Sequence, residues 1–300
     1  MRDPRGSGRL QRLKLIWRIF YDSVWHFAAD DGWAIASHIA LSTLMALFPF
    51  LIVVTALAGF FFGSKDLADE AARILLEAWP KQVAGPIAQD ITSVLTGNNR
   101  GVLTFGVLFA VYFASSGVES LRIGLNRAYD MVEARPWWLL RLESILYVLI
   151  GAVALLVFSF FVVFAPAIWN TLLIFAPKVE PFGSTVTFVR YAVAVIVLIV
   201  ALMVMHTWLP AGRRSLREIA PGIVATLVLW LIAGAVFGRY LAEYAFAYTS
   251  MYAGLASAMI ALVFLYLCAS IFVFGAELNS TVVKIREGIE EEPKGKAIKE

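Results

Sequence analysis

The stretch ALVFLYLCASIFVFGAEL, residues 261–278, carries one charged side chain, that of Glu277, in an otherwise apolar run. It ends the last of several long apolar segments, and an α-helix of about 20 residues crosses the roughly 30 Å of hydrocarbon in a bilayer. The runs are continuously apolar rather than alternating, which favours helices over barrel strands. The sequence therefore predicts an all-α membrane protein with six spans. They are predicted at 33–62, 102–117, 142–164, 188–209, 219–240 and 253–278.

The composition agrees with a bilayer as the solvent. Hydrophobic residues make up 60% of the 300 positions and charged residues only 16%, more apolar surface than a soluble domain of this size hides. Residues 1–32 contain no uninterrupted apolar core with a small-residue cleavage site, so no cleaved signal peptide is expected. The predicted organisation is an interfacial segment at 1–32, a transmembrane domain at 33–283 with an outer loop at 63–100, and a mobile charged tail at 284–300.

The distribution of Lys and Arg predicts the orientation. Basic residues gather before the first span, between spans two and three, between spans four and five, and after span six, which places both termini in the cytoplasm. These residues are Arg2, Arg5, Arg9, Arg12, Lys14, Arg18, Arg122, Arg127, Arg135, Arg141, Arg213, Arg214, Arg217, Lys284, Arg286, Lys294, Lys296 and Lys299.

Three segments outside the spans have patterns of their own. Apolar and basic residues at helical spacing over 10–27 predict an amphipathic helix in the inner interface, attracted by the anionic head groups of membrane lipids. The outer loop predicts two short amphipathic helices, either capping the bundle or lying on the lipid surface. Residues 165–177, bracketed by prolines, are too short to span and predict an interfacial segment.

A polar stripe marks the second span, whose helix is predicted to continue through Glu119 toward Asn126. Ser115, Glu119, Arg122 and Asn126 follow one another at spacings of four, three and four, so they share one helical face. Ionisable groups at membrane depth are costly and mark function or pairing within the bundle. Either Glu119 and Arg122 form an intrahelical ion pair, or the stripe lines a site for a substrate head group or ion.

The first span offers a second candidate. His38 and Ser42 share a face at i,i+4, and Pro49 interrupts the helix after them. A proline inside a span frees a backbone carbonyl, which transporters use at binding sites and ordinary bundles also tolerate. His38 is therefore either a hydrogen-bonded packing residue or a proton carrier.

The remaining candidates concern pairing and packing. Glu277 and Asn279 lie near the inner end of the last span, where Arg122 or Arg127 are the expected partners of Glu277 in a structural clamp or a gate. Two GxxxG patterns predict close helix contacts in the outer half of the bundle, because missing side chains let backbones approach. Their glycines are Gly59, Gly63, Gly234 and Gly238.

Several function classes are excluded by what the sequence lacks. The three histidines are scattered, the single cysteine Cys268 sits in an apolar span, and no HxxxH, CxxC, GxSxG or phosphate loop occurs. The sequence therefore predicts no catalytic residues, no metal and no cofactor. Basic residues sit at helix ends and report topology, so no nucleic-acid partner is expected.

The chain resembles the YihY/virulence factor BrkB family of bacterial inner-membrane proteins. The resemblance rests on IASHIALSTLMALFPFLIVV at 35–54, ASSGVESLRIGLNRAYD at 114–130 with RPWW at 135–138, LP at 209–210 before REIAPG at 217–222, and ALVFLYLCASIFVFGAELNS at 261–280. One departure is His38-Ile39, where relatives commonly carry an aromatic pair. The resemblance implies six spans and a role in envelope maintenance, with lipid or amphiphile movement as the activity. The family's former label, ribonuclease BN, disagrees with the missing catalytic constellation.

Two functional classes follow. The first is a transporter or flippase-like protein for a lipid or other amphiphile, consistent with the polar stripe, Pro49 and two oppositely oriented three-span halves. The second is a nontransporting membrane scaffold or partner-binding protein, and a membrane nuclease is a distant third. A cavity or lateral groove that reaches Glu119 and Asn126 favours transport, and a tightly filled bundle favours the scaffold.

Overall fold

The computed structural model describes residues 4–62, 100–159, 182–252 and 256–288, together with Trp169, Leu172, Leu173 and Phe175. All regular secondary structure in these residues is helical, as the sequence predicts. The helices are α1 (Pro4–Ala29), α2 (Gly32–Phe62), α5 (Arg100–Ala128), α6 (Trp137–Ser159), α8 (Gly183–Trp208), α9 (Leu216–Tyr252) and α10 (Ala256–Glu287). The predicted outer loop and most of 165–177 lie outside the described residues.

Four stretches of the described helices are long and apolar enough to cross a membrane. They are Trp137–Val157, Gly183–Trp208, Leu216–Glu243 and Ala258–Glu287, and Gly32–Leu47 forms a shorter apolar stretch. α5 carries the polar stripe of the second predicted span, which lowers its hydropathy although it is long enough to cross. The chain is therefore a multi-pass membrane protein.

The helix arrangement leaves one pair of neighbours loosely joined. α2 packs closely against α5 and α10, and α10 packs closely against α9, whereas α8 contacts α9 and, more sparsely, α6. One core cluster joins α2, α5, α9 and α10 around Leu125, Ile219 and Phe272, and a second joins α2, α5 and α6 around Val54 and Ala152. The bundle is thus filled around α2 and α10 and more open between α6 and α8.

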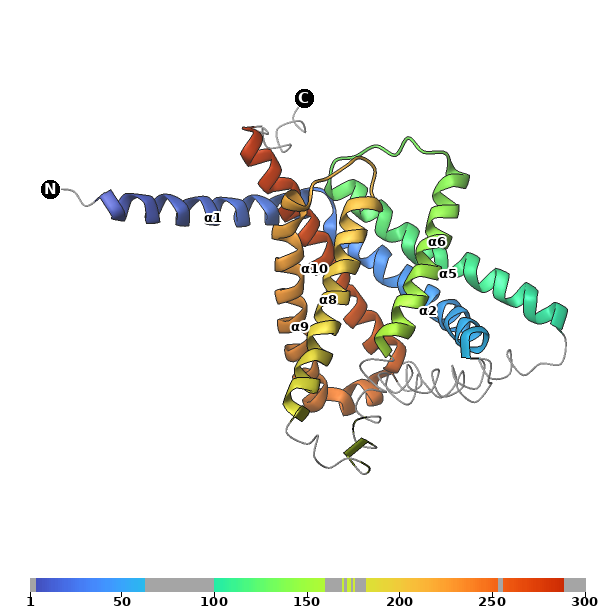
Figure 1. Cartoon of the computed structure of the whole chain (residues 1–300). Coiled ribbons are helices and arrows are strands. Elements are labelled where there is room, and N and C mark those ends of the chain that lie inside the picture. The colour runs from blue at the N-terminus through green and yellow to red at the C-terminus, as the bar shows by residue number, and fades with distance from the viewer. Residues whose placement is uncertain are drawn as a thin grey trace.

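Both connections that carry the inner-loop arginines lie at one end of the bundle. Figure 1 shows α1, the 129–136 connection, the 209–215 connection and the C-terminal end of α10 at this end. α1 projects sideways from it, across the direction of α8 and α9. Trp17, Phe20 and Trp25 are exposed on α1, as expected for a helix lying in a membrane interface.

The end of α5 is fixed by its C-cap. Asp130 adopts a left-handed conformation with φ of 52°, which Asp tolerates better than most residues. The N–H of Met131 donates to the carbonyl of Asn126 at 2.8 Å and that of Asp130 to Arg127 at 3.1 Å, the two bonds of a Schellman motif. Lys284 of α10 donates to the Asp130 carboxylate at 2.6 Å. This contact holds α10 helical past the predicted start of the tail at residue 284.

The structure differs from two expectations about helix shape and packing at the residues it describes. α2 continues as one helix through Pro49 to Phe62, because a single proline removes one backbone bond while the flanking turns keep theirs. Gly234 and Gly238 have open space where a Cβ would sit, and Gly59 and Gly63 have no described surroundings. A close approach of helices occurs instead between Gly222 of α9 and Gly275 of α10, where a Cβ on Gly222 would collide with the Gly275 carbonyl oxygen.

Candidate functional site

A cluster of ion pairs around Arg135 ties the 129–136 connection to α6 and α8. The guanidinium donates to Glu133 at 2.7 and 2.8 Å, to Glu143 at 2.8 Å and to the carbonyl of Leu209 at 3.2 Å. The bidentate contact with Arg135 lowers the pKa of Glu133 to about 2, and the same contact raises the pKa of Arg135. Both groups are therefore charged at neutral pH and their charges compensate each other.

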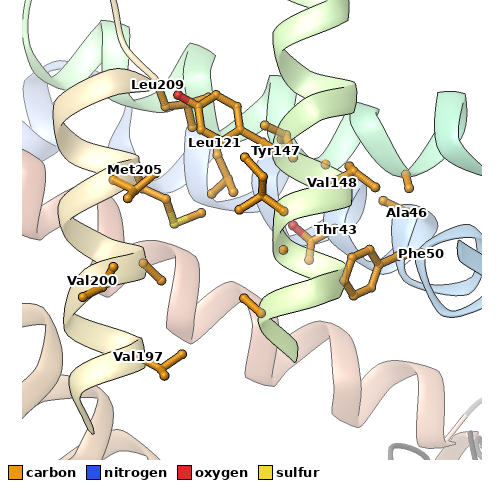
Figure 2. A pocket seen from close by; sticks show the side chains of 18 of the residues that line it. Thr43, Ala46, Phe50, Leu121, Tyr147, Val148, Val197, Val200, Met205 and Leu209 are labelled. Carbon is orange, nitrogen blue, oxygen red and sulfur yellow. The ribbon is translucent and has the colours of Figure 1, made fainter. Parts of the chain in front are cut away.

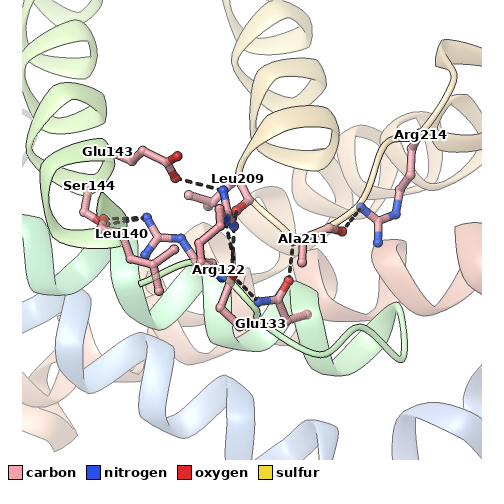
Figure 3. Close-up of polar contacts among 10 residues, drawn as sticks. Arg122, Glu133, Leu140, Glu143, Ser144, Leu209, Ala211 and Arg214 are labelled. Carbon is pink, nitrogen blue, oxygen red and sulfur yellow. Dashed lines mark hydrogen bonds and ion pairs between the residues drawn. The ribbon is translucent and has the colours of Figure 1, made fainter. Parts of the chain in front are cut away.

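Asn126 joins this cluster to the second connection. Its Nδ2 donates to Glu133 Oε2 at 3.1 Å, and its Oδ1 accepts from the backbone N–H of Ala211 at 2.7 Å. Figure 3 shows the resulting series of contacts, from Glu143 of α6 through Glu133 to Ala211 and Arg214, with the separate Arg122–Ser144 contact beside it. Asn126, predicted as a candidate binding residue, is thus a positioning residue for two loops.

The two charged residues of the predicted stripe pair with α6 and not with each other. Arg122, with 2% of its surface exposed, donates from Nη2 to the Leu140 carbonyl at 3.0 Å and to Ser144 Oγ at 2.7 Å. Glu119 accepts from Arg141 at 2.6 Å, and the Arg141 guanidinium lies 3.7 Å over the Tyr112 ring. The predicted intrahelical pair was therefore wrong, because α6 brings a better-placed cation and acceptors to the same face.

A second polar cluster lies deeper, between α5, α8, α9 and α10. Asn279 Oδ1 accepts from the N–H of Gly222 at 2.6 Å, so its Nδ2 faces Tyr129 and donates to the hydroxyl at 3.1 Å. The hydroxyl lies 2.8 Å from Nδ1 of His206, and its own proton then points to that nitrogen. His206 has no exposed surface. These groups hold four helices together at the Gly222–Gly275 contact.

Arg214 covers this cluster on the side of the 209–215 connection. Its guanidinium lies 3.7 Å over the ring of Tyr129 and donates from Nη1 to the Ala211 carbonyl at 3.1 Å. Partial burial lowers the pKa of Arg214, which leaves an arginine charged at neutral pH. Gly212, with φ of 84°, allows the turn that brings Arg214 back toward α5.

The two connections enclose a polar pocket of about 810 Å³. Three arginines and one glutamate line it, so its lining has a net charge of +2. Trp208 and Pro210 form part of its wall. The charged lining residues are Glu133, Arg135, Arg213 and Arg214.

An apolar groove of about 650 Å³ runs between α2, α5, α6 and α8. Figure 2 shows Thr43, Ala46 and Phe50 of α2 facing Val197 and Val200 of α8 across the groove. Tyr147, Leu121 and Leu209 lie together at one end of it. Its wall on α5 also includes Gly117 and Val118 but not Glu119 or Asn126. The groove therefore suits an apolar chain rather than a polar solute.

Three consecutive residues divide between the linings of the groove and of the polar pocket. Leu209 lines the groove, while its neighbours Trp208 and Pro210 line the pocket. The Leu209 carbonyl is the acceptor for Arg135 described above. An elongated apolar space thus ends beside a basic pocket at the end of the bundle where the arginine-rich connections lie.

The other predicted residues lie apart from this arrangement. His38 is exposed and Ser42 half-buried on α2, and neither lines the groove, whereas the adjacent Thr43 does. Ser115 is buried and donates to the Tyr112 carbonyl of its own helix at 2.6 Å. Arg127 is exposed.

Of the two predicted partners of Glu277, Arg122 forms its hydrogen bonds with α6 and Arg127 is exposed. Glu277 is buried, with 2% of its surface exposed, and Arg122 directs its hydrogen bonds to α6. Asn279, predicted beside it, proves to be the residue that connects α9 to Tyr129. Among the described residues, no three His, Cys, Asp or Glu side chains come close enough to hold a metal ion.

Sequence reasoning missed several residues of the site. Tyr129, Glu133 and His206 received no role and Arg135 and Arg214 only a topological one, although Tyr129 and Arg135 fall in the conspicuous LNRAYD and RPWW motifs. A helical face cannot reveal them, because four of these five lie outside the helices and His206 lies on an otherwise apolar one. The usable signal was a charged loop motif between two spans.

Comparison with known proteins extends over nearly the whole chain. The family model described as virulence factor BrkB matches residues 24–299. The ribonuclease-like protein YfkH of Bacillus subtilis strain 168 is 26% identical over 89% of this chain and 96% of its own length. The UPF0761 membrane protein RC1_0578 of Rhodospirillum centenum is 26% identical over 87% of this chain, which spans 56% of that relative's length.

A third relative and the solved structures complete the comparison. The UPF0761 membrane protein PSHAa0171 of Pseudoalteromonas translucida is 24% identical over 86% of this chain and 83% of its own length. No solved structure matches the chain significantly. With a family model that covers residues 24–299, the chain belongs to the virulence factor BrkB family of membrane proteins.

Proposed function

We propose that this protein moves a lipid or similar amphiphile in the bacterial inner membrane, with the lipid's acyl chain in the groove between α6 and α8. The observation that carries the proposal is the apolar groove that ends, at Leu209, beside an arginine-lined pocket. An amphiphile has the same two parts in the same order. The proposal assigns no catalytic chemistry to the protein.

The proposed topology has six spans, α2, α5, α6, α8, α9 and α10, with both termini in the cytoplasm. The arrangement in Figure 1 supports it, because α1 and the arginine-bearing connections lie at one end of the bundle. Positive residues in short loops mark the cytoplasmic side. The polar pocket then opens at the inner leaflet, where a lipid head group lies.

The groove fits the shape of an acyl chain but does not bind it strongly. Lipid tails are as apolar as Leu side chains, so an acyl chain gains little hydrophobic free energy on leaving the bilayer for an apolar groove. The head group must therefore supply most of the binding selectivity. A weakly held tail is also what transport requires, since a substrate that binds too tightly does not leave.

The filled and open parts of the bundle support transport over a purely structural role. One core joins α2, α5, α9 and α10 and a second joins α2, α5 and α6, which gives a well-packed frame. α8 has few contacts with α6 across the groove, and it is held from the other side by Leu202 in the core and by the His206–Tyr129 contact. A purely structural scaffold with a fully packed interior has no need for two helices, such as α6 and α8, that contact each other only sparsely.

Gly151 offers a test of the groove. It lines the groove on α6 and has open space at its Cβ position, so Gly151→Phe places a ring in the groove without a clash at the backbone. Gly234→Phe is the matched control, because Gly234 also has open space at its Cβ and lies on α9 outside the groove lining.

The measurement is the transbilayer movement of a fluorescent phospholipid in vesicles that contain the purified protein, followed by dithionite quenching. The wild type and Gly234→Phe should accelerate the movement over protein-free vesicles, and Gly151→Phe should not. Lipid binding without acceleration in any protein would instead identify a nontransporting scaffold. Equal acceleration by both variants would remove the groove from the mechanism.

A further inference from the structure

The polar pocket contains two arginines that form no direct ion pair within the described residues. Arg135 is compensated by Glu133 and Glu143, but neither Arg213 nor Arg214 forms an ion pair with a described residue. Glu218, the nearest acidic residue along the chain, accepts from the N–H of Ser215 at 3.0 Å and so caps the start of α9; its charge also attracts that of Arg214, without a direct ion pair. The surplus positive charge of the pocket therefore belongs to Arg213 and Arg214.

Arg214 is held ready for a ligand. Stacking on Tyr129 at 3.7 Å and the bond from Nη1 to Ala211 at 3.1 Å fix the plane of the guanidinium. Stacking uses the face of the group and leaves N–H donors along its edge, the fork that suits two oxygens of a phosphate. The exposed Arg213 adds a second cation to the same pocket.

The carboxylate in the pocket cannot serve a cationic ligand. Both oxygens of Glu133 accept hydrogen bonds, from Arg135 and from Asn126. An ammonium group of a zwitterionic lipid would therefore meet two arginines that form no ion pair, and no free carboxylate in the pocket lining. The pocket, with a volume within the usual range for small-ligand sites, favours an anionic head group.

We infer that this pocket binds the phosphate of an anionic glycerophospholipid between Arg213 and Arg214, with the acyl chain of the same molecule in the groove. The inference rests on the proposed function and names the substrate class. Trp208 and Pro210 on the pocket side and Leu209 on the groove side place head and chain next to each other. A basic pocket between spans at the cytoplasmic side is the usual form of such head-group sites.

The test is lipid competition on the purified full-length protein. Mixed micelles offer equal amounts of dioleoyl phosphatidylglycerol and dioleoyl phosphatidylcholine, and mass spectrometry counts the lipids that stay bound. The wild type should enrich phosphatidylglycerol, and the double variant Arg213→Gln, Arg214→Gln should lose at least about tenfold of that preference, as expected for lost charge-assisted hydrogen bonds. An unchanged preference overturns the inference.

Two controls separate a specific site from a basic surface. Arg217→Gln removes a charge from the same region but from outside the pocket lining, and it should keep the preference. A loss equal to that of the double variant would show a general surface attraction and overturn the site. The single variant Arg213→Gln gives an independent reading, because Arg213 is exposed and its removal leaves the Arg214 contacts intact; it should weaken the preference.

Two further measurements in the same experiment test whether the bound phosphate belongs to a lipid and whether the groove holds the acyl chain. Neither sodium phosphate nor glycerol phosphate at millimolar concentration should displace bound phosphatidylglycerol; displacement would show a site for free phosphates and overturn the lipid assignment. Gly151→Phe should reduce bound lipid of both kinds while the remaining lipid keeps the head-group preference. Full lipid binding by Gly151→Phe contradicts the proposed acyl-chain site in the groove but does not affect the head-group preference measured with the arginine variants. Failure of the proposed function and failure of this inference are therefore distinguishable.

Discussion

The side chain of Asn126 accepts a hydrogen bond of 2.7 Å from the backbone N–H of Ala211, 85 residues further along the chain. This bond links the end of α5 to the connection that carries Arg213 and Arg214. The same amide donates to Glu133, so this side chain, together with the Arg135–Leu209 bond, joins both walls of the polar pocket. The shape of the pocket depends on it.

Removing this side chain should therefore loosen the pocket without emptying the core. We expect Asn126→Ala to lower the free energy of unfolding by about 1 to 3 kcal/mol, since the backbone N–H of Ala211 loses its partner and Glu133 loses one of its donors. Thermal unfolding in detergent measures the loss. Ser116→Ala, on the same helix and half-buried, is the control; if Asn126→Ala is as stable as this control, the bridging role is wrong.

The Glu133–Arg135 pair should make stability depend on acid pH. The folded protein lowers the pKa of Glu133 from 4.5 to about 2, so the unfolded chain takes up the proton first as the pH falls. The stabilisation is fully present above pH 4.5 and is lost as the pH falls toward 2. Glu133→Gln should remove this part of the pH dependence in detergent unfolding. A wild-type-minus-variant difference that stays constant over this window contradicts the pairing.

The ion pair between Glu119 and Arg141 predicts that the stability effects of mutating these two residues are coupled. A double-mutant cycle of Glu119→Gln and Arg141→Gln should give a coupling of about 0.5 kcal/mol, small because Glu119 is partly exposed. The same cycle of Glu119→Gln with Arg122→Gln should give a smaller value, since these residues do not pair. Stronger coupling to Arg122 would restore the intrahelical pair that the sequence suggested.

The packing of α9 on α10 should be sensitive at Gly222 and Gly275 and insensitive at the GxxxG glycines. Gly222→Leu forces atoms into the Gly275 backbone and should cost about 3 kcal/mol or prevent folding. Gly238→Leu, with open space at its Cβ, should leave the midpoint of thermal unfolding nearly unchanged. A larger loss at Gly238 would show a contact of this surface with another copy or partner.

The fold was predictable from the sequence to the extent that composition and periodicity determine it. The helical class, the long continuation of the second span through Asn126 and the polar face of α5 follow from patterns within single segments. The interaction partners of these polar residues do not follow from such patterns. Which cation meets Glu119 depends on the position of α6 relative to α5, and a helical wheel of one segment contains no such information.

The site itself was predictable only in part. Asn126 was chosen for its helical spacing and Asn279 for its place near the inner end of the last span. Both prove to be positioning residues, because amides satisfy backbone groups that helix ends and close helix contacts leave open. Arg135 and Arg214 act from loops, where no periodicity marks them. The groove arises from the loose α6–α8 contact, a property of packing that no single segment displays.

The most direct test of the account is to locate the acyl chain itself. A structure of the protein in lipid nanodiscs containing phosphatidylglycerol with brominated acyl chains would show the bromine positions. The account predicts bromine density in the groove beside Gly151 and Val200, with head-group density next to Arg214. Bromine density confined to the outer surface of the bundle, with the groove closed by contact between α6 and α8, would contradict it.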